Sequence, residues 1–362
     1  MDGPTHMKTF TYAANASRVV FGAGALREVA AEVGRLGALR ALVLCTPEQA
    51  DSARRVAELL GDRAVGIFAK AVMHVPLETA REAGAEAARL GADCAVAIGG
   101  GSTTGLGKAI ALESSLPILA IPTTYAGSEM TPIWGITEAG VKKTGRETRV
   151  LPRTVIYDPE LTLTLPLSLT VTSALNAIAH AAEGLYAHDG NPILSLMAEE
   201  GIRASAAALA PLQANPRDLA ARSDALYGAW LCGTVLGGAS MGLHHKLCHT
   251  LGGSFNLPHA DTHTVVLPHV LAYNAAMAPE AMARIARALS LPDAADVPRA
   301  LQALAARHGA PTSLRALGMP SEGLDRAADL AVTNQYPNPR PLERAPLRAL
   351  LQRAFEGAPP AP

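Results

Sequence analysis

The sequence has no excess of charge of either sign and no long uninterrupted apolar run. Its 31 Lys and Arg residues almost balance its 32 Asp and Glu residues, which gives a formal net charge of −1. Without a basic cluster, the protein is not expected to bind nucleic acid or the anionic surface of a membrane. Without an apolar run of about 20 residues, it is not expected to cross a membrane.

Cysteines and aromatic residues are also scarce. The four cysteines form no C-x-x-C pair and stand at Cys45, Cys94, Cys232 and Cys248. This usage is typical of structural thiols in a reducing compartment, so we expect a cytoplasmic protein. Aromatic residues make up only 4% of the chain. The abundant Ala and Leu residues favour helices and an aliphatic core.

The first part of the chain alternates between short apolar runs and segments with helical periodicity. Four runs have the length and composition of buried parallel strands: Ala41–Cys45, Cys94–Ile98, Ile118–Ile121 and Thr154–Tyr157. Helical periodicity is found between them, at Gly24–Leu36, Gln49–Leu60 and Thr79–Leu90. This alternation predicts an α/β domain built on a doubly wound parallel sheet.

After Asp158 the strand-like runs nearly vanish. Long Ala- and Leu-rich segments follow, at Thr172–Ala187, Pro192–Ala210, Leu219–Leu236, Pro279–Leu289 and Ala345–Phe355. We therefore expect a dinucleotide-binding domain at 8–160 and an all-helical C-terminal domain at 161–357, since 362 residues suffice for two domains. Thr170 or Thr172 can cap the first of these helices. We expect residues 1–7 to be a leader or tag and the Pro-rich residues 358–362 to be a flexible tail.

A glycine run lies where one predicted strand ends and the predicted helix Leu106–Leu112 begins. It consists of Gly99, Gly100, Gly101 and Ser102. Consecutive glycines let the backbone approach a diphosphate, and the helix N-terminus supplies free N–H groups and a positive dipole end. The context of strand, glycines and helix favours a phosphate-binding loop over the alternative, a tight turn.

A second polar loop leaves the next predicted strand in the same way. Its residues Thr123, Thr124 and Tyr125 place three hydroxyl groups at the carboxyl end of that strand. Such groups suit a sugar, a phosphate or a nicotinamide amide, because open α/β sheets bind ligands at this edge. The alternative is a threonine-rich turn without a ligand.

Histidines are concentrated in one stretch, at His244, His245, His249 and His259. On a helix, His245 and His249 lie on one face because they are four residues apart. His180 lies in a separate predicted helix, one turn after an amide residue, Asn176. A metal site would want a carboxylate at that position, and an amide oxygen is a far poorer ligand for Fe²⁺ or Zn²⁺. Three histidines can hold zinc, and core histidines satisfied by backbone groups are a further alternative.

Taken together, these motifs resemble the iron-containing alcohol dehydrogenase family. The resemblance covers nearly the whole chain and includes the glycine loop, the Pro122-Thr-Thr turn, Asp158-Pro159, the Asn176 helix and the histidine series, in order and at family spacing. It implies an N-terminal dinucleotide-binding domain, a helical C-terminal domain, catalysis in the cleft between them and a homodimer.

In metal-dependent members of that family, one Asp and three His hold a divalent ion. The matching positions here are Asn176, His180, His245 and His259. Three strings are most similar to a subgroup that reduces maleylacetate without a metal: Thr123–Met130, Gly242–Gly252 and Tyr336–Arg340. We therefore expect no metal. The alternatives are a metal-dependent dehydrogenase of a small alcohol or aldehyde, a lyase that uses NAD transiently, and a regulator that binds nucleotide without catalysis.

The resemblance implies hydride transfer from NADH or NADPH to the activated C=C bond of maleylacetate, giving 3-oxoadipate in bacterial aromatic degradation. Two imidazoles, His245 and His249, are expected to donate a proton and stabilise the oxyanion. The side chains of His259 and His180 are expected to shape the pocket.

A small dicarboxylate substrate needs positive charge or several hydrogen-bond donors in its pocket. The expected contacts are Tyr125, Asn176, His244, Lys246 and Arg340. Alternatives remain for two of them: Arg340 can form a surface ion pair with Glu343, and His244 can point away from the His245 face.

Cofactor preference follows from the residue after the second strand. The family's Asp position matches Thr46 here, and a neutral hydroxyl can accept either a ribose or its 2′-phosphate. We therefore expect the protein to use both NADH and NADPH. Lys142 matches a family lysine that approaches the nucleotide.

Overall fold

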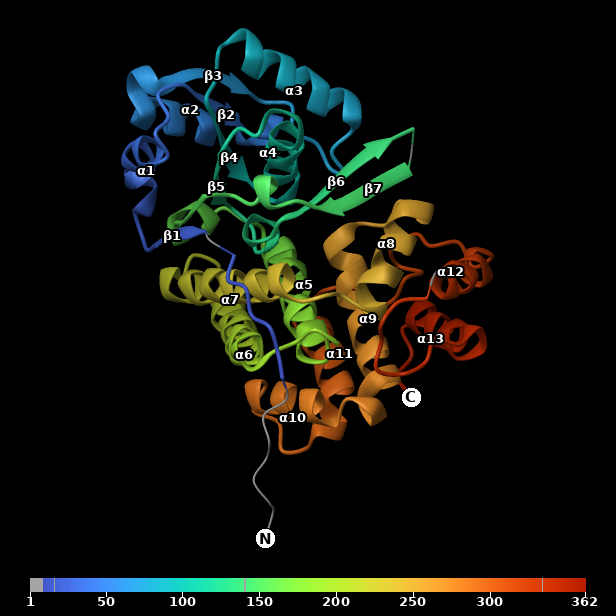
Figure 1. Ribbon diagram of the computed structural model, residues 1–362. Helices are drawn as coiled ribbons and strands as arrows, with labels where there is room; N and C mark the ends of the chain where they lie inside the picture. Colours follow the sequence, from blue (N-terminus) through green and yellow to red (C-terminus); the bar gives the residue numbers. More distant parts are fainter. Residues whose placement is uncertain (1–8, 16, 140, 334) are drawn as a thin grey trace.

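The computed structural model describes residues 9–15, 17–139, 141–333 and 335–362 (Figure 1). Its main sheet has six parallel strands: β1 (Arg18–Phe21), β2 (Ala41–Leu44), β3 (Ala64–Phe68), β4 (Cys94–Gly99), β5 (Ile118–Pro122) and β8 (Thr154–Tyr157). The helices of this region are α1 (Val29–Arg35), α2 (Ala50–Leu60), α3 (Leu77–Arg89) and α4 (Gly101–Ser114). The predicted α/β domain with a doubly wound parallel sheet is confirmed.

The strand order places a topological switch point between β2 and β4. The order across the sheet is β1-β8-β5-β4-β2-β3. The chain leaves β2 toward β3 on one side, whereas β4 begins the series that continues through β5 on the other side. Doubly wound sheets bind ligands at the carboxyl ends of the strands that flank such a point. Here those ends are Leu44 and Gly99.

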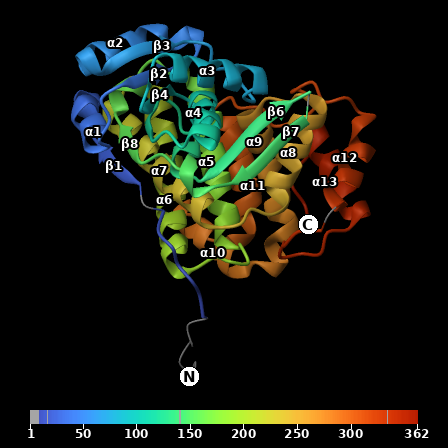
Figure 2. The same ribbon diagram turned by 45° about the horizontal axis from the view of Figure 1, so that its top comes forward.

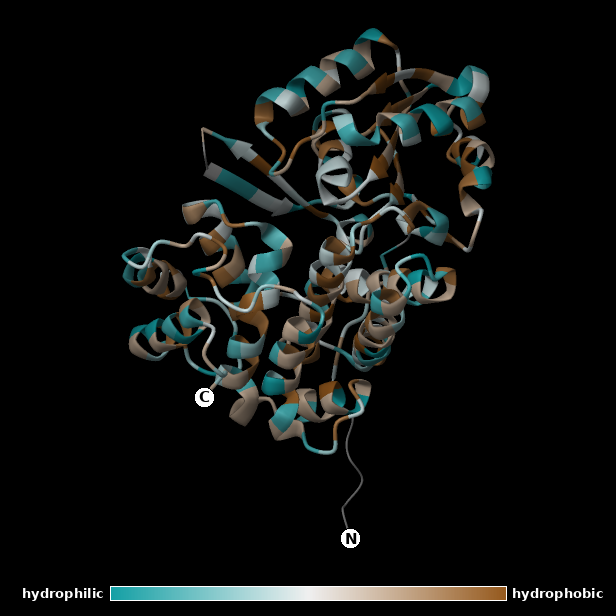
Figure 3. Ribbon diagram, turned by 180° about the vertical axis from the view of Figure 1, so that it is seen from behind, coloured by the Kyte–Doolittle hydropathy of each residue, from teal (hydrophilic) through white to brown (hydrophobic). Residues whose placement is uncertain are grey.

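Alternating side chains of the sheet form a core on each of its faces. Val43 and Cys45 belong to the cluster that contains buried residues of α1 and α2, whereas Leu42 and Leu44 belong to the cluster with α3 and α4. Figure 3 shows the hydrophobic strands lying between helices whose outer turns are hydrophilic. Because both faces are covered, the central strands are continuously apolar, which is why the sequence predicted them.

Two edge strands and a hairpin were not predicted. The edge strand β3 is only partly buried, and the other edge strand, β1, begins with an exposed arginine. Strands β6 (Ile133–Glu138) and β7 (Val141–Arg146) form a separate antiparallel hairpin. Figures 1 and 2 show this hairpin projecting from the side of the sheet, with α8 (Leu243–Phe255) next to it.

The rest of the chain is helical and contains two apolar clusters. The helices are α5 (Leu167–Leu185), α6 (Pro192–Ala214), α7 (Leu219–Gly238), α8, α9 (His259–Asn274), α10 (Pro279–Ala288), α11 (Val297–Arg307), α12 (Gly323–Val332) and α13 (Arg344–Glu356). One cluster joins α5, α6, α7, α10 and α11, and the other joins α8, α9, α12 and α13. Helix α5 is buried over most of its length because helices surround it.

The predicted cap of α5 is wrong. The helix begins at Leu167, directly after Pro166. Thr170 and Thr172 therefore lie inside the helix, where the Thr172 hydroxyl donates to the carbonyl oxygen of Ser168 at 3.2 Å. A proline before the first turn starts the helix here without a side-chain cap.

The two ends of the chain were predicted to be a leader and a flexible tail. The predicted leader at 1–7 lies outside the described residues. In the Pro-rich tail, Ala358 accepts a hydrogen bond from Gln302 of the helical region at 3.0 Å, and Pro360 is buried.

All four cysteines are free and buried, and burial raises the pKa of the Cys94 thiol to about 12.

Among the described residues, no single helix has the length and apolarity to span a membrane. Helices α7 and α8 meet that test only as a pair, and they bend by 96° at their junction.

Candidate active site

The glycine loop starts helix α4 at the switch point of the sheet. Gly100 is the N-cap residue and uses no side-chain cap, so Gly101 and Ser102 begin the helix with free N–H groups. This arrangement attracts a phosphate through both hydrogen bonds and the helix dipole. The loop predicted from the sequence is thus present at the edge where doubly wound sheets bind ligands.

The surface of this loop requires glycine. Gly99 has a φ of +151°, and a Cβ atom there would lie 2.4 Å from the Thr103 hydroxyl and 2.5 Å from Oε1 of Gln49. The buried Thr103 hydroxyl has no hydrogen-bond partner among the described residues, and Gln49 donates to the Thr123 hydroxyl at 2.7 Å. A Cβ at Gly100 would meet Thr124 at 3.1 Å. These residues fit a nucleotide diphosphate.

The second polar loop connects the nucleotide end of the sheet to the helical region. Thr123 donates its N–H to the carbonyl oxygen of Gly99 at 3.0 Å. Two residues later, the Tyr125 N–H donates to the Ser173 hydroxyl of α5 at 2.9 Å. The Ala126 carbonyl oxygen then lies 3.3 Å from Nε2 of His180. This one loop therefore contacts both the glycine loop and a residue of the histidine series.

Gly127 allows this connection, and its replacement should disrupt the site. Its φ is +78°, and a Cβ would lie 3.0 Å from Cα of Gly233 in α7. We expect Gly127→Ala to add a backbone strain of about 1–2 kcal/mol to this contact, and to lower both the melting temperature and kcat/KM. Gly37→Ala is the control, because Gly37 has a similar φ of +75° and open space around it. Equal effects of the two variants on kcat/KM would contradict this interpretation.

Six imidazoles gather where α5, α8 and α9 meet. They are His180 of α5, His244, His245 and His249 of α8, and His259 and His263 of α9. The ring centroids of His180 and His245 are 4.9 Å apart, and those of His259 and His263 are 4.3 Å apart. His263 was not among the predicted site residues, although it lies one helical turn after His259. We refer to these six residues as the histidine cluster.

The buried members of the histidine cluster are hydrogen-bonded to one another. Nδ1 of His180 lies 2.8 Å from Nε2 of His245, and Nδ2 of Asn176 lies 3.2 Å from Nε2 of His180. Nε2 of His244 lies 2.9 Å from Nδ1 of His263. The other nitrogen of His263, Nε2, is buried and without a partner among the described residues. Nδ1 of His244 is likewise buried and without a partner among the described residues, so the cluster has a fixed interior and two free buried nitrogens.

A carboxylate that the sequence analysis missed anchors this interior. Glu183 is fully buried one turn after His180, and its Oε2 lies 2.6 Å from Nδ1 of His245. It also accepts hydrogen bonds from the N–H groups of Gly242, His244 and His245, at 2.8–3.2 Å. These N–H groups belong to the N-terminus of α8, which favours a negative charge.

Desolvation by the surrounding protein lowers the pKa values of His180, His244, His249, His259 and His263, so these five imidazoles are neutral. Desolvation lowers the pKa of His259 to about 3, and the positive charge of Lys142 adds to the shift. Desolvation also holds the pKa values of His180, His244 and His263 well below their ordinary value. These five rings thus offer neutral N–H groups and lone pairs, not fixed positive charges.

Comparison with known proteins agrees with this arrangement. The description "Iron-containing alcohol dehydrogenase" matches residues 16–159, and "Fe-containing alcohol dehydrogenase family, C-terminal" matches residues 170–355. The chain belongs to the iron-containing alcohol dehydrogenase family. This membership confirms the family predicted from the sequence and the expectation of an oxidoreductase.

Individual members of the family are very similar to this chain. Maleylacetate reductase from Burkholderia cepacia is 70% identical over 98% of this chain and 100% of its own length. Maleylacetate reductase from Sphingobium indicum is 60% identical over 97% of this chain and 99% of its own length. The crystal structure of maleylacetate reductase from Agrobacterium tumefaciens has a TM-score of 0.94 and 55% identity, and the match covers 98% of this chain and all of that one.

The donor set of the cluster does not match the metal site expected of metal-dependent family members. His180, His245 and His263 each place one nitrogen within 4.8 Å of the others. However, the 2.8 Å contact between His180 and His245 is a hydrogen bond, and it is shorter than the roughly 3.4 Å between two nitrogens bound tetrahedrally to one zinc ion. The position of the carboxylate ligand holds Asn176, whose amide donates to His180.

Tyr125 does not face the cluster, so its predicted role as a substrate donor is wrong. Its side chain is fully buried, and its hydroxyl accepts a hydrogen bond from Arg222 at 3.2 Å. Arg222 is itself fully buried and also donates to Thr170 at 2.7 Å. The direction of the phenol is set by a residue of α7 that is distant in sequence.

Removal of the Tyr125 hydroxyl should therefore affect stability and not substrate binding. We expect Tyr125→Phe to lower the free energy of unfolding by about 1–3 kcal/mol, because Arg222 loses one buried acceptor. The KM for the substrate should stay within about twofold of the wild-type value, since a shift of that size is far below the loss of a hydrogen bond. Denaturant unfolding and steady-state kinetics measure the two quantities, and a large rise in KM without loss of stability would contradict the placement.

Three residues that were predicted to contact the substrate have partners within the protein. Arg340 stacks on the ring of Tyr273, 4.1 Å from its centroid, and donates to the Tyr273 carbonyl oxygen at 3.2 Å. The ammonium of Lys246 lies over the ring of Tyr336, 5.8 Å from its centroid. His244 is fully buried behind His263. The structure therefore does not bring Arg340 or His244 to an open surface of the cluster.

The remaining predicted residues lie near the expected nucleotide. Thr46 follows β2 and begins a short 3₁₀ helix, next to the switch point. Lys142 of β7 extends along Gly135 of β6, whose added Cβ would lie 3.0 Å from Cε of Lys142. The positive charge of Lys142 lowers the pKa values of both His249 and His259.

Proposed function

We propose that this protein reduces the activated C=C bond of maleylacetate to 3-oxoadipate with NADH or NADPH, as a step of bacterial aromatic-compound degradation. The observation that carries the proposal is the 70% identity to a maleylacetate reductase over 98% of the chain. It is supported by the histidine cluster, which one short loop links to the glycine loop.

The proposed substrate carries its own activation. Hydride from the nicotinamide adds to one carbon of the double bond, and the electron pair moves onto the conjugated ketone oxygen to give an enolate. Protonation of the adjacent carbon completes the reaction. One maleylacetate, one NAD(P)H and one proton thus give one 3-oxoadipate and one NAD(P)⁺. The protein must orient the partners, donate hydrogen bonds to the enolate and supply the proton.

The open members of the histidine cluster are best suited to the proton transfer. His249 is exposed and His259 is partly exposed, and their rings stack with centroids 6.4 Å apart. We therefore assign to these two residues the hydrogen bond to the enolate and the relay of a proton from water, since a neutral imidazole can accept a proton on one nitrogen while it releases one from the other. His245 was expected to donate as well, but both of its nitrogens are engaged by His180 and Glu183. We assign His245 and His180 to the walls of the site.

The nucleotide is proposed to lie along the glycine loop. The N–H groups of Gly101 and Ser102 would hold the diphosphate, and Gly99 and Gly100 would let it approach. Thr123, Thr124 and Lys142 would contact the nicotinamide half. Thr46 would contact the adenosine ribose, and its neutral hydroxyl supports the use of both NADH and NADPH.

We further propose that the reaction needs no metal, because the donor set of the cluster does not fit one. An amide replaces the carboxylate ligand, and its N–H group is directed at the imidazole that would bind the ion. The carboxylate of Glu183 lies on the far side of His245. Cys248 is a poor substitute, because burial holds its thiol pKa well above the ordinary value. As the family resemblance implies, we propose a cytoplasmic homodimer.

The proposed function is tested by the identity of substrate and product. Purified protein is incubated with maleylacetate and NADH, and the products are identified by mass spectrometry. We expect one 3-oxoadipate for each NADH oxidised, and no NADH formation from NAD⁺ with ethanol or 1,3-propanediol. Oxidation of such alcohols without reduction of maleylacetate would instead identify an alcohol dehydrogenase.

A further inference from the structure

The hydrogen bonds around Glu183 have a fixed direction. Its carboxylate accepts from three main-chain N–H groups and from Nδ1 of His245, and the Glu183 side chain is fully buried. With these four donors directed at it, the Glu183 carboxylate acts as an acceptor, so the proton between it and His245 belongs to the imidazole. A single hydrogen on the His245 ring therefore lies on Nδ1, which leaves a lone pair on Nε2.

This direction passes on to His180 and Asn176. Because Nε2 of His245 accepts at 2.8 Å, the hydrogen of His180 must also be on Nδ1. Nε2 of His180 is then an acceptor, and it faces the Asn176 amide, which donates from Nδ2 at 3.2 Å. The Ala126 carbonyl oxygen, 3.3 Å from the same nitrogen, would gain a donor only in the opposite direction. The 2.6 Å hydrogen bond between His245 and the Glu183 carboxylate outweighs the 3.3 Å contact between His180 and the Ala126 carbonyl oxygen.

We propose that Glu183 is a positioning residue that fixes the tautomers of His245 and His180 and thereby requires a hydrogen-bond donor at position 176. Asn176 meets that requirement and an aspartate does not. The amide that replaces the family's carboxylate ligand is thus coupled to a buried carboxylate on the far side of two imidazoles. The effect of this series of hydrogen bonds on turnover rests on the proposed function. The positions of the ring hydrogens do not depend on that function.

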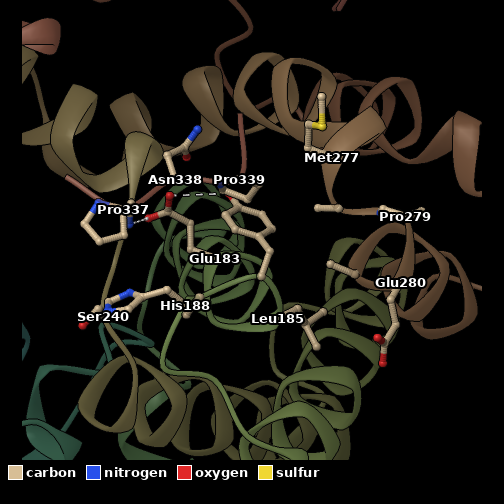
Figure 4. Close-up of a pocket in the computed structure, with 15 residues that line it drawn as sticks. Glu183, Leu185, His188, Ser240, Met277, Pro279, Glu280, Pro337, Asn338 and Pro339 are labelled. Atoms are coloured by element: carbon tan, nitrogen blue, oxygen red, sulfur yellow. Dashed lines mark hydrogen bonds between the residues drawn. The ribbon is translucent and has the colours of Figure 1, made fainter. Parts of the chain in front are cut away.

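Glu183 lines a cavity of about 560 Å³ whose lining does not include Asn176. Figure 4 shows Glu183 in its wall, near Pro337 and Asn338. Exposed residues such as Met277 and Glu280 form the rim, so the cavity opens to solvent. A small anion can therefore reach the place of the Glu183 carboxylate once that side chain is removed.

The first test reads the tautomers directly. The ¹⁵N chemical shifts of histidine-labelled protein distinguish protonated from unprotonated ring nitrogens, and single His→Gln variants assign the signals. In the wild type we expect hydrogen on Nδ1 of both His180 and His245. In Glu183→Ala we expect both rings to change, although Glu183 does not contact His180. Hydrogen on Nε2 of either ring in the wild type, or an unchanged His180 in the variant, would overturn the proposal.

The second test uses turnover of maleylacetate. We expect Glu183→Ala to lower kcat by about tenfold to a hundredfold, as for other residues that orient an imidazole, with the KM for NADH unchanged. Added formate should restore part of kcat by entering the cavity. Glu183→Gln keeps an acceptor for His245 and should lose less. If Glu183→Ala does not fold, Glu183→Gln still tests the proposal, because it should retain both tautomers; a changed His245 there would overturn it.

The matched control is Glu129→Ala. Glu129 is also a buried carboxylate, and it accepts from the Tyr157 hydroxyl at 2.8 Å, outside the histidine cluster. We expect a loss of stability, unchanged histidine tautomers and no rescue by formate. Formate rescue of this control would overturn the assignment of the effect to Glu183. If no variant and no wild type reduces maleylacetate, the proposed function fails, while the tautomer measurement still decides the present inference.

Discussion

Asn176→Asp should raise the affinity of the histidine cluster for a divalent cation by about tenfold or more and lower the turnover of maleylacetate, because carboxylates are much better ligands than amides. The variant has a carboxylate at each end of the hydrogen-bonded series, Glu183 beside His245 and Asp at position 176 beside His180. Two neutral imidazoles cannot donate to both carboxylates and also hydrogen-bond to each other. The site then takes up positive charge between them. Isothermal titration with Zn²⁺ and steady-state kinetics measure the two effects.

The control for this variant is Asn191→Asp. Asn191 is buried and caps α6 by accepting from the N–H of Leu194 at 3.1 Å, a role that an aspartate can also fill. It should change neither zinc affinity nor turnover. If Asn176→Asp increased the rate of maleylacetate reduction, the proposal that the amide is adapted to this reaction would be wrong.

Gly99→Ala should nearly abolish nucleotide binding. The new Cβ would lie 2.4 Å from the Thr103 hydroxyl and 2.5 Å from Gln49, which is closer than any stable contact. Relief of this overlap would displace Gln49 from Thr123 and move the loop that faces the diphosphate. We expect the Kd for NADH to rise about a hundredfold, which corresponds to about 2.7 kcal/mol. Fluorescence titration of NADH measures it.

Gly101→Ala provides the comparison within the same loop. A Cβ at Gly101 meets Ala126 at an ordinary 3.6 Å, and alanine is favoured in a helix over glycine. We expect little change in the Kd for NADH and a small gain in stability. Equal losses of affinity in the two variants would show that the loop does not hold the nucleotide in the proposed way.

The sequence predicted the central sheet and the glycine loop because both depend on local patterns. A strand covered on both faces is a continuous apolar run, and β2, β4, β5 and β8 all have this character. Edge strands such as β3 have one partly exposed face, so their composition differs less from that of loops. The hairpin of β6 and β7 contains Lys and Thr residues and lacks a buried face of its own.

The histidine cluster was only partly predictable. His263 follows His259 by one helical turn, the same spacing as His245 and His249, so the signal was present. Glu183 was also visible as the single charged residue in the apolar segment from Leu175 to Leu185. Such a charge in a buried helix needs a partner. The sequence could not show that its partners are the N-terminus of α8 and His245, because those contacts depend on how two distant helices pack.

The direction of individual side chains was not predictable at all. Tyr125 lies in a polar loop at the correct edge of the sheet, yet Arg222 of α7 holds its hydroxyl in the core. Arg340 lies in a string shared with the family, yet it stacks on Tyr273. Sequence motifs located the site to a few residues, whereas the roles of those residues depended on contacts between segments far apart in the chain.

The most direct test of the account is turnover of maleylacetate by protein of known metal content. The protein is analysed for iron and zinc, dialysed against a chelator and assayed with maleylacetate and NADH. The account predicts that metal-free protein oxidises NADH as fast as untreated protein and that added Fe²⁺ or Zn²⁺ gives no increase. Loss of activity in the chelator, with recovery on addition of either metal, would contradict it.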